Sequence, residues 1–458
     1  MGDESNGDVY TFDLDDTSEG FAFGGPIIKD KAFFYVTYEE AEISKPITHG
    51  PIGSGLPNNI RITTDEVANI RQITQDVYGF DPLGYTSSNV SMQEFTTVRL
   101  DYDLTDPSWS IGDIKREVPI VASAMDSVVD VNTAVELTKL GSIGVINMEG
   151  IQTRYENPDE ILNQIASVGK NDFVPLMQKI YSEPVKEGLI LQRINEVKEG
   201  GGIAAFSGTP QAAIKFKETL NNSKIDLFFL QGTVVSTEHL GMEGKETLNI
   251  KDLCQSMNVP VVAGNCVTYE VAKLLMDAGV AGLMVGIGPG AACTSRGVLG
   301  IGIPQATAIA DCSAARNDYF KESGRYIPII GDGGIVTGGD ICKCLACGAD
   351  AVMIGSPIAK SSNAPGKGFH WGMATPSPVL PRGTRIEVGS TGSLERIIKG
   401  PALLDDGTHN LLGAIRTSMS TLGAKNIKEM QEVEIVIAPS LLTEGKVYQK
   451  AQQLGMGK

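Results

Sequence analysis

The sequence predicts an α/β protein of the (β/α)8, or TIM-barrel, class, and three observations lead to this prediction. Short apolar runs rich in β-branched residues alternate with helical stretches from residue 107 onward, which is the rhythm of parallel strands joined by crossover helices. Eight such units fit into about 250 residues, the usual size of a closed barrel. No G-x-G-x-x-G sequence opens a first helix, so a doubly wound sheet is the weaker alternative.

Each predicted strand is a short run of Val, Ile and other apolar residues that ends in a turn signal. Helical stretches such as residues 268–279 separate the strands. The eight strands are predicted over residues 118–124, 143–148, 202–207, 226–231, 259–265, 282–288, 326–334 and 351–356.

Residues 1–106 differ from the rest of the chain. The first hundred residues hold 16 Asp and Glu against 6 Lys and Arg, and they lack the strand–helix alternation. We expect a mainly β or poorly ordered segment here, with a hairpin over residues 21–42 that turns at residues 29–31. The predicted domains are therefore 1–106 and a barrel over 107–458.

Composition excludes several classes of partner. The net charge of -17 argues against nucleic acid and against an anionic membrane surface. The sequence has no run of about 18 apolar residues and no N-terminal signal peptide, so we expect a cytoplasmic protein. Seven cysteines, an odd number, indicate free thiols. Cys342, Cys344 and Cys347 are expected to be small buried residues of one helix, which is a better interpretation than a metal cluster.

The polar ends of the predicted strands indicate an active site. Chemistry in a (β/α)8 barrel takes place at the carboxyl ends of its strands. Five ends carry polar or glycine-rich residues: Ser123-Ala-Met125-Asp126, Gly264-Asn265, GIGPGAACTSRG (286–297), Asp332-Gly-Gly334 and Gly355-Ser356.

Two of these ends predict the binding of a mononucleotide. Gly334, Gly355 and Ser356 follow the last two strands, where backbone amides and helix starts often hold a phosphate. Asp332 would repel a phosphate, but its carboxylate can accept both hydroxyl protons of a ribose. The base would then lie toward the glycine-rich loop.

Cys293 is the candidate nucleophile of that loop. The glycines before it and the nearby Arg296 favour an exposed, ionisable thiol, which could attack an electrophilic ring carbon. A small buried residue is the alternative interpretation.

Together these motifs resemble those of the IMP dehydrogenase and GMP reductase family. GIGPGAACTSRG is similar to the family's cysteine loop, whose usual form is GIGPGSxCTTR. Residues 332–356 resemble its phosphate region, HWGMATP its base-contacting turn, and LLGAIRTSMSTLGA its closing segment. The resemblance covers residues 107–458. It is closest to the short IMP-dehydrogenase-like subgroup without the CBS regulatory domain, since only about 55 residues separate Met148 from the third strand.

The resemblance implies the oxidation of IMP to XMP with NAD, a step in the biosynthesis of guanine nucleotides from purine precursors, by a homotetramer. Cys293 would attack C2 of the purine, hydride would pass to NAD, and water would release XMP. The implied residues are Ser295 beside the nucleophile; Ser123, Met125, Gly372 and Met373 around the nucleotide; Asn265, Gly286 and Gly288 near the nicotinamide; and the carbonyls of Gly288, Gly290 and Cys293 around a potassium ion.

The chain departs from the family pattern at several positions. The usual serine of the cysteine loop is Ala291, and the usual Asp after the fourth strand is Gln231. The segment TPSPVL has no room for the long flap whose Arg-Tyr pair activates water. We expect Arg382 to replace that pair, with Arg385 as the other candidate; for each, a simple bound cation is the alternative.

Two rival functions stay open. GMP reductase uses the same cysteine with NADPH and expels ammonia, but Arg382 stands where it would need an acidic glutamate. A catalytically silent barrel that binds purine nucleotides is the other rival, and the intact cysteine loop argues against it.

Residues 8–106 resemble a fragment of a TonB-dependent outer-membrane receptor. The resemblance rests on GGPIIKDK followed by AFFY, and on VYGFDPLGYTSSN. A membrane barrel needs at least about eight strands. This segment has three or four, so a working receptor is excluded and a fused fragment is expected.

Overall fold

The computed structural model describes residues 99–232, 235, 248–373 and 385–437, together with the backbone of five strands nearer the N-terminus. The chain divides into two compact units, Met1–Gly84 and Tyr85–Lys458. The N-terminal strands are β1 (Glu19–Ile28), β2 (Ala32–Glu40), β3 (His49–Ile52), β4 (Asn58–Thr63) and β5 (Val90–Met92). Strands β1 and β2 pair antiparallel, which confirms the predicted hairpin.

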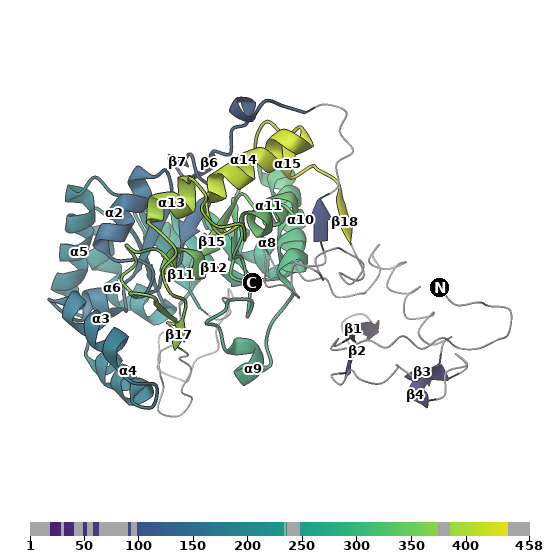
Figure 1. The fold of residues 1–458 in the computed structure, drawn as a ribbon, viewed down its shortest axis with the longest axis horizontal. Coiled ribbons are helices and arrows are strands. Elements are labelled where there is room, and N and C mark those ends of the chain that lie inside the picture. The colour runs from purple at the N-terminus through teal and green to yellow at the C-terminus, as the bar shows by residue number, and fades with distance from the viewer. Residues whose placement is uncertain are drawn as a thin grey trace. The chain divides into compact units, whose positions relative to one another are not determined.

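Eight parallel strands of the second unit close into a barrel in the order β8 to β15. Figure 1 labels three of them, β11, β12 and β15, among the surrounding helices. Closure confirms the predicted (β/α)8 class and excludes the doubly wound sheet, which would be open. The strands are β8 (Ile120–Ala122), β9 (Ile143–Asn147), β10 (Ala205–Gly208), β11 (Leu227–Gln231), β12 (Val261–Cys266), β13 (Gly282–Val285), β14 (Ile329–Asp332) and β15 (Ala351–Ile354). All eight overlap the predicted strands.

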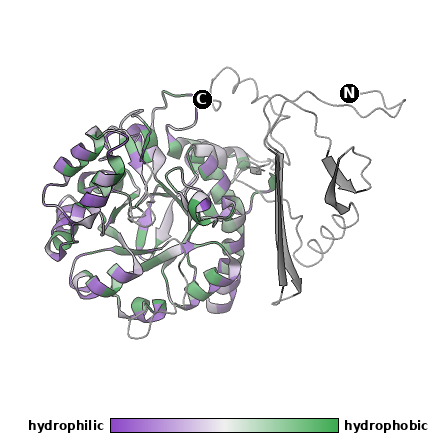
Figure 2. Cartoon of the chain, turned by 90° about the horizontal axis from the view of Figure 1, so that it is seen from below, coloured by the Kyte–Doolittle hydropathy of each residue, from purple (hydrophilic) through white to green (hydrophobic). Residues whose placement is uncertain are grey.

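Helices surround the strands, as Figure 2 shows. Threonine side chains at positions 209, 268 and 337 accept hydrogen bonds from the first turns of three of these helices, which is why the chain turns into a helix soon after a strand. The main helices are α2 (Val131–Lys139), α5 (Glu187–Glu199), α6 (Pro210–Asn221), α7 (Ile250–Ser256), α8 (Tyr269–Asp277), α10 (Gln305–Ser323), α11 (Gly338–Ala346), α13 (Leu394–Lys399) and α14 (Leu411–Leu422).

The second unit also contains short helices and strands outside the eight barrel strands and the main helices. They are η3 (Tyr102–Leu104), β6 (Trp109–Ile111), β7 (Ile114–Arg116), η4 (Ile151–Thr153), α3 (Pro158–Ser167), α4 (Phe173–Ser182), α9 (Ser295–Leu299), α12 (Ser356–Ala359), β16 (Phe369–Trp371), β17 (Arg385–Glu387), α15 (Ile427–Met430) and β18 (Ile435–Ile437).

The core consists of two layers. One lies between the strands and the helices and the other fills the barrel interior, so the strands are buried on both faces and are apolar throughout. The hairpin of β6 and β7 contributes Trp109 and Ile111 to the interior layer, and Trp109 Nε1 donates to the Val118 carbonyl at 3.0 Å. This hairpin covers the end of the barrel where the strands begin, which leaves the carboxyl ends for the site.

Three cysteines were predicted to be small buried residues of one helix, and the structure shows them buried on or beside α11. Cys342 and Cys344 are buried on α11, and Cys347 is buried directly after it. Burial raises the pKa of the Cys342 thiol to about 11. The three therefore act as small apolar residues between α11 and the rest of the core.

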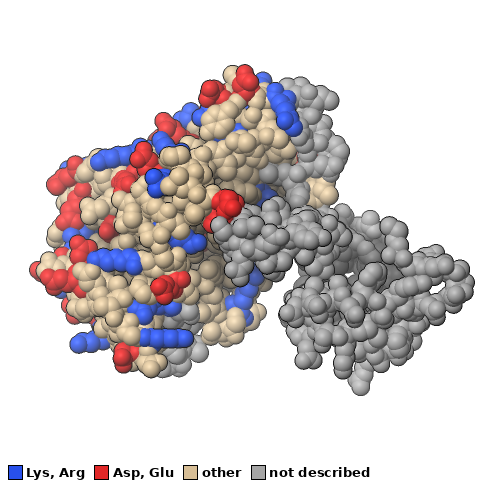
Figure 3. Space-filling model, viewed as in Figure 1, with Lys and Arg blue, Asp and Glu red and all other residues tan. Residues whose placement is uncertain are grey.

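The described surface carries both signs of charge. Lys and Arg are interspersed with Asp and Glu on the face shown in Figure 3, with no large basic patch there. None of the helices in the described part of the chain has the length and apolar character needed to cross a bilayer.

Residues 100–106 are bound to the barrel. Leu100 and Ser420 exchange hydrogen bonds, and the amide of Asp106 donates to the Lys425 carbonyl at 2.7 Å. Arg416 of α14 stacks on the ring of Tyr102, with its guanidinium carbon 4.2 Å from the ring centre. By these contacts the segment belongs with the second unit.

A pair of truncations tests this assignment. A protein that begins at residue 85 should unfold at the same temperature as the barrel of the full chain, because it keeps all of these contacts. A protein that begins at residue 107 should unfold about 5 °C lower, since it loses several hydrogen bonds and one stacked pair. Thermal unfolding followed by circular dichroism measures both, and equal midpoints would show that residues 85–106 contribute nothing.

Candidate active site

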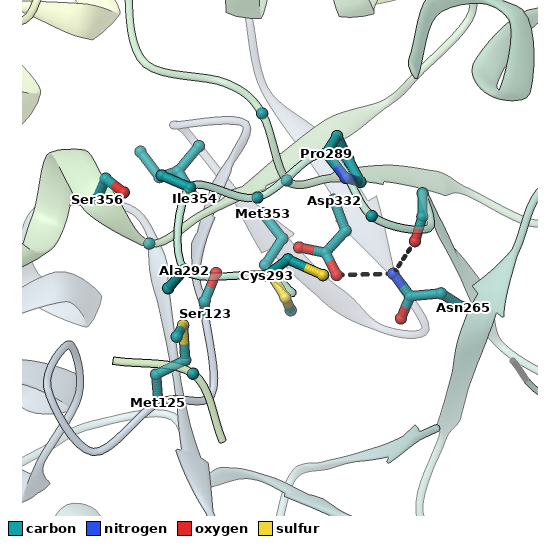
Figure 4. Close-up of a pocket in the computed structure, with 18 of the residues that line it drawn as sticks. Ser123, Met125, Asn265, Pro289, Ala292, Cys293, Asp332, Met353, Ile354 and Ser356 are labelled. Atoms are coloured by element: carbon teal, nitrogen blue, oxygen red, sulfur yellow. Dashed lines mark hydrogen bonds between the residues drawn. The ribbon is translucent and has the colours of Figure 1, made fainter. Parts of the chain in front are cut away.

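A cavity of about 430 Å³ opens at the carboxyl ends of the strands. Fourteen of the fifteen residues that the sequence predicts for the site line it (Figure 4). They come from the ends of six elements far apart in the chain, so the topology of the barrel brings them together. The fifteenth, Arg382, lies outside the described residues.

Cys293 is the exposed cysteine of the chain. All seven cysteines are described, and of these Cys293 alone is exposed. Its amide donates to the Gly290 carbonyl at 2.9 Å, which forms a tight turn. Ser295 begins α9 two residues later and is buried. The thiol is therefore accessible to a molecule in the cavity, as the sequence predicted.

The Arg296 side chain packs against the backbone of the cysteine loop and of the segment that follows it. Its Nη2 donates to the Ile303 carbonyl at 2.7 Å. A Cβ atom added at Gly288 or at Gly302 would lie 2.6 Å from Arg296 Cγ, so only glycine lets the backbone pack on both sides of this side chain. The expected pairing of Arg296 with the thiolate is not what the contacts show, because the guanidinium is engaged with the loop backbone.

Asp332 and Asn265 form a polar wall of the cavity beside the start of the cysteine loop. Asn265 Nδ2 donates to Asp332 Oδ2 at 2.8 Å and to the Gly286 carbonyl at 2.6 Å. Asp332 is half-buried at the cavity wall, and desolvation raises the pKa of Asp332 to about 6, against the lowering effect of the Asn265 hydrogen bond. The carboxylate is thus ionised at neutral pH and can accept hydroxyl protons from a ligand.

The glycines near Asp332 allow a close approach of backbone to backbone. A Cβ at Gly286 (φ 143°) would lie 2.2 Å from the Asp332 carbonyl oxygen. At Gly334 (φ 73°), it would lie 2.9 Å from Pro289 Cβ. The loops after β13 and β14 therefore meet closely, with Pro289 against Gly334, and both loops line the cavity beside Gly355 and Ser356.

His370 is a lining residue that sequence reasoning missed. It lies on β16, its Nδ1 is 3.1 Å from Ser127 Oγ, and its ring edge lies against Gly355. Burial lowers the pKa of His370 to about 4, so the imidazole is neutral near pH 7. The sequence could have indicated this role, because His370 stands two residues before Gly372 in the HWGMATP turn that resembles the family's base-contacting segment.

Gln231 lies at the end of β11 and lines the cavity floor. Its Nε2 is 3.6 Å from Met284 Sδ and 3.9 Å from Met353 Sδ. A neutral amide suits this sulfur-rich floor better than a carboxylate would, because desolvation penalises a charge.

Arg385 does not line the cavity. Its guanidinium lies between the rings of Phe173 and Phe369, 4.8 and 4.4 Å from their centres. It donates to the Val168 carbonyl at 2.9 Å and to the Ile165 carbonyl, at the end of α3. The alternative that Arg385 activates water is therefore wrong for this structure: the side chain packs two elements together.

Comparisons with known proteins agree with this geometry. Residues 86–375 match the sequence model of the IMP dehydrogenase / GMP reductase domain. The chain belongs to this family.

Several relatives extend the match. An uncharacterized oxidoreductase of Mycolicibacterium smegmatis is 38% identical over 339 residues, covering 72% of this chain and 90% of that protein. An inosine-5'-monophosphate dehydrogenase of Cryptosporidium parvum is 29% identical, covering 73% and 87%. The crystal structure of an IMP dehydrogenase/GMP reductase-like protein from Corynebacterium glutamicum superposes with a TM-score of 0.73 at 32% identity, covering 78% and 95%.

These matches support the family resemblance of the barrel. The family match begins at residue 86, before the predicted join near residue 107. The resemblance of residues 8–106 to TonB-dependent receptors has no support in these comparisons.

Replacing Asp332 with asparagine tests the pH dependence of stability. Because the pKa of Asp332 in the folded protein, about 6, is above its ordinary value of 3.8, the folded state takes up this proton first as the pH falls. The free energy of unfolding should therefore fall as the pH rises from about 4 to about 6. In Asp332→Asn this fall should be smaller by on the order of 2 kcal/mol. Urea unfolding at several pH values measures it, and identical slopes for both proteins would contradict the burial of this charge.

Proposed function

We propose that this protein oxidises IMP to XMP with NAD, in the synthesis of guanine nucleotides. The observation that carries the proposal is the exposed thiol of Cys293 in the same cavity as the half-buried Asp332 carboxylate and the glycine-rich ends of β14 and β15. These three features suit the base, the ribose and the phosphate of one purine mononucleotide. Other family members named for this activity include the relative from Cryptosporidium parvum.

The proposed reaction begins with the thiolate of Cys293. It would form a bond to C2 of the purine, whose hydrogen would leave with its electron pair. NAD, bordered by Asn265, Gly286 and Gly288, would supply the acceptor for this hydride. The thioimidate left on the enzyme is then hydrolysed: water adds to C2, the C–S bond breaks, and XMP and the free thiol are released. Ser295 and Arg382 remain the candidates for proton transfer in the second step.

Substrate binding follows from the lining residues. The Asp332 carboxylate accepts the ribose hydroxyl protons, while amides at Gly334, Gly355 and Ser356 face the phosphate. Ser123, Met125, Gly372 and Met373 enclose the ring. Because Ala291 has no hydroxyl, the phosphate has one donor fewer than the usual family loop supplies.

The cofactors fit this cavity to different extents. Asn265, Gly286 and Gly288 form a wall with few side chains, so a flat nicotinamide ring could approach the purine closely. Backbone carbonyls are the ligands that potassium prefers. However, the Gly290 carbonyl already accepts the Cys293 amide, and the Arg296 side chain packs on Gly288. The loop fits potassium only in part, so no step is assigned to the ion.

A homotetramer in the cytoplasm is part of the proposal. It rests on the resemblance to the family, since the described residues belong to one chain. Size-exclusion chromatography with light scattering measures the oligomeric state.

GMP reductase is the second candidate, because the family includes both activities. This enzyme would convert GMP to IMP, with NADPH as hydride donor and ammonia as leaving group.

A barrel that binds purine nucleotides without turnover is the third candidate. The exposed thiol favours either enzyme over the silent barrel, since a silent site has no use for it.

Paired assays separate these candidates. The purified protein should form NADH from IMP and NAD, with rising absorbance at the NADH band, and should not consume NADPH in the presence of GMP. The reverse result would establish the reductase instead. Binding of IMP without either reaction would establish the silent barrel.

Cys293→Ser tests the covalent step. Serine keeps the shape of the side chain, but its hydroxyl is almost never ionised near neutral pH. The variant should bind IMP with unchanged affinity and lose at least about four orders of magnitude in rate, on the order of 5 kcal/mol of barrier.

The matched control is Cys254→Ser. Cys254 is half-buried on α7 and does not line the cavity, so this variant should keep the wild-type rate. Mass spectrometry of the wild type with IMP and NAD should find the purine adduct on the peptide containing Cys293. Hydride transfer that survives in Cys293→Ser would contradict a covalent intermediate.

A further inference from the structure

The helical pair α3–α4 (residues 158–182) follows β9 and packs against β16, next to the cavity. Trp371 of β16 is fully buried in the apolar cluster that this pair forms. The cluster consists of Ile151, Leu162, Ile165, Phe173, Met177, Ile180, Tyr181 and Trp371. The pair contributes no residue to the lining of the cavity. Any effect of the pair on the site must therefore pass through the residues that contact both the pair and the lining.

A buried chain of hydrogen bonds connects this pair to the loop after β8. Trp371 Nε1 donates to Tyr181 Oη at 3.2 Å, and Tyr181 Oη donates to Asp126 Oδ2 at 2.6 Å. The Ile151 amide donates to the same oxygen at 2.9 Å. Asp126 and Tyr181 are both buried, so water does not replace these bonds.

Asp126 is tied directly to the cavity wall. It follows Met125, which lines the cavity, and its amide donates to Met373 Sδ at 3.4 Å. Tyr181 Oη also lies 3.7 Å from Met373 Sδ. The two methionines that are expected to frame the purine are therefore held from behind by one tyrosine and one aspartate.

Ser127 adds a second connection between the same two segments. Its Oγ lies 3.1 Å from His370 Nδ1 and accepts from the Trp371 amide at 3.4 Å. Its carbonyl accepts from the Gly366 amide at 3.2 Å. The loop after β8 and strand β16 are thus fixed to each other, and a displacement of Asp126 would displace both.

Gly150 packs closely against Asp126 on the side away from Tyr181 Oη. A Cβ atom at Gly150 would lie 2.2 Å from Asp126 Oδ1. A buried carboxylate that loses one of its donors pays a desolvation cost that the neighbouring groups cannot offset. Removal of the Tyr181 hydroxyl would therefore shift the loop rather than leave it in place.

We propose that the α3–α4 pair is a positioning element of the nucleotide cavity: Tyr181 holds Asp126, and through it holds Met125 and Met373 at the spacing that a bound purine nucleotide requires. The proposal rests on the proposed function for the identity of the ligand. It concerns residues that touch the lining and not the ligand itself, so Tyr181 and Asp126 are positioning residues.

The pKa of Asp126 depends on the groups around it and can therefore report the loss of the Tyr181 hydrogen bond. Burial raises the pKa of Asp126 to about 6, while the hydrogen bonds from Tyr181 and Ile151 and the Arg154 guanidinium lower it. Arg154 stacks on the Tyr181 ring, 5.8 Å from its centre, and the facing residues of β16 are Trp371 and the neutral His370. Loss of the Tyr181 hydroxyl removes a stabilising donor from the ionised form, which moves the pKa of Asp126 upward.

Trp371 can report this titration. The chain has two tryptophans, and in Trp109→Phe only Trp371 remains, one hydrogen bond away from the Tyr181–Asp126 pair. In this background we expect the fluorescence of Trp371 to titrate with a midpoint near pH 6. The midpoint should move to higher pH in Tyr181→Phe and disappear in Asp126→Asn. Either variant can be used if the other fails to fold.

Nucleotide affinity is measured in the same proteins by calorimetry with IMP and GMP. Tyr181→Phe should weaken binding about five- to tenfold and raise KM, while kcat changes less than about twofold. Tyr155→Phe is the matched control: it makes the same change at a partly buried tyrosine that packs against the cluster and donates from its Oη to the Ile180 carbonyl at 2.9 Å. It should leave both affinity and midpoint unchanged.

The possible outcomes separate this proposal from the proposed function. If the wild type binds a purine nucleotide but fails to reduce NAD, the proposed oxidation fails while the positioning role can still be judged from affinity. Unchanged affinity and midpoint in Tyr181→Phe would overturn the positioning role, even in an active enzyme. Equal losses in Tyr155→Phe and Tyr181→Phe would also overturn it, because they would indicate a general loosening of the cluster.

Discussion

Barrel closure is the constraint on which the rest of this structure depends. Eight parallel strands that pair all round have their carboxyl ends on one rim, and the β6–β7 hairpin with Trp109 covers the opposite end. Residues separated by more than two hundred positions, such as Ser123 and Ser356, therefore share one cavity. Neither the nucleophile nor the carboxylate would have a partner in an open sheet with a different strand order.

Within that rim, the glycines decide how near the loops come to one another. At Gly286 and Gly288 a single added carbon atom would meet Asp332 or Arg296 at distances well under 3 Å. The cysteine loop can therefore lie against the end of β14 while the Cys293 side chain remains exposed. Arg296 of the same loop donates to the Ile303 carbonyl, which holds the loop against the segment that precedes α10.

Much of the fold and part of the site follow from local patterns. The eight strands were predictable because strands buried on both faces are short apolar runs bounded by turn signals. Many of the site residues were predictable because they follow such a run, whereas Ser295, Gly372 and Met373 were expected only from the family resemblance. His370 and Arg385 were not predictable in this way. The neutral state of His370 depends on burial behind Ser127 and Gly355, and the role of Arg385 depends on two aromatic rings from distant parts of the chain.

The sequence by itself determined the class of fold, the order of the strands and the family, because periodicity and motif spacing are local properties of the chain. It also determined which residues could supply the nucleophile, the carboxylate and the glycines that let the backbone approach a phosphate. Only the tertiary structure decided the electrostatic state and support of those groups: the raised pKa of Asp332, the Asn265 bridge, and the buried contact of Tyr181 with Asp126. The physical reason is that desolvation and hydrogen bonding depend on neighbours in space, and folding brings those neighbours from elements far apart in the sequence.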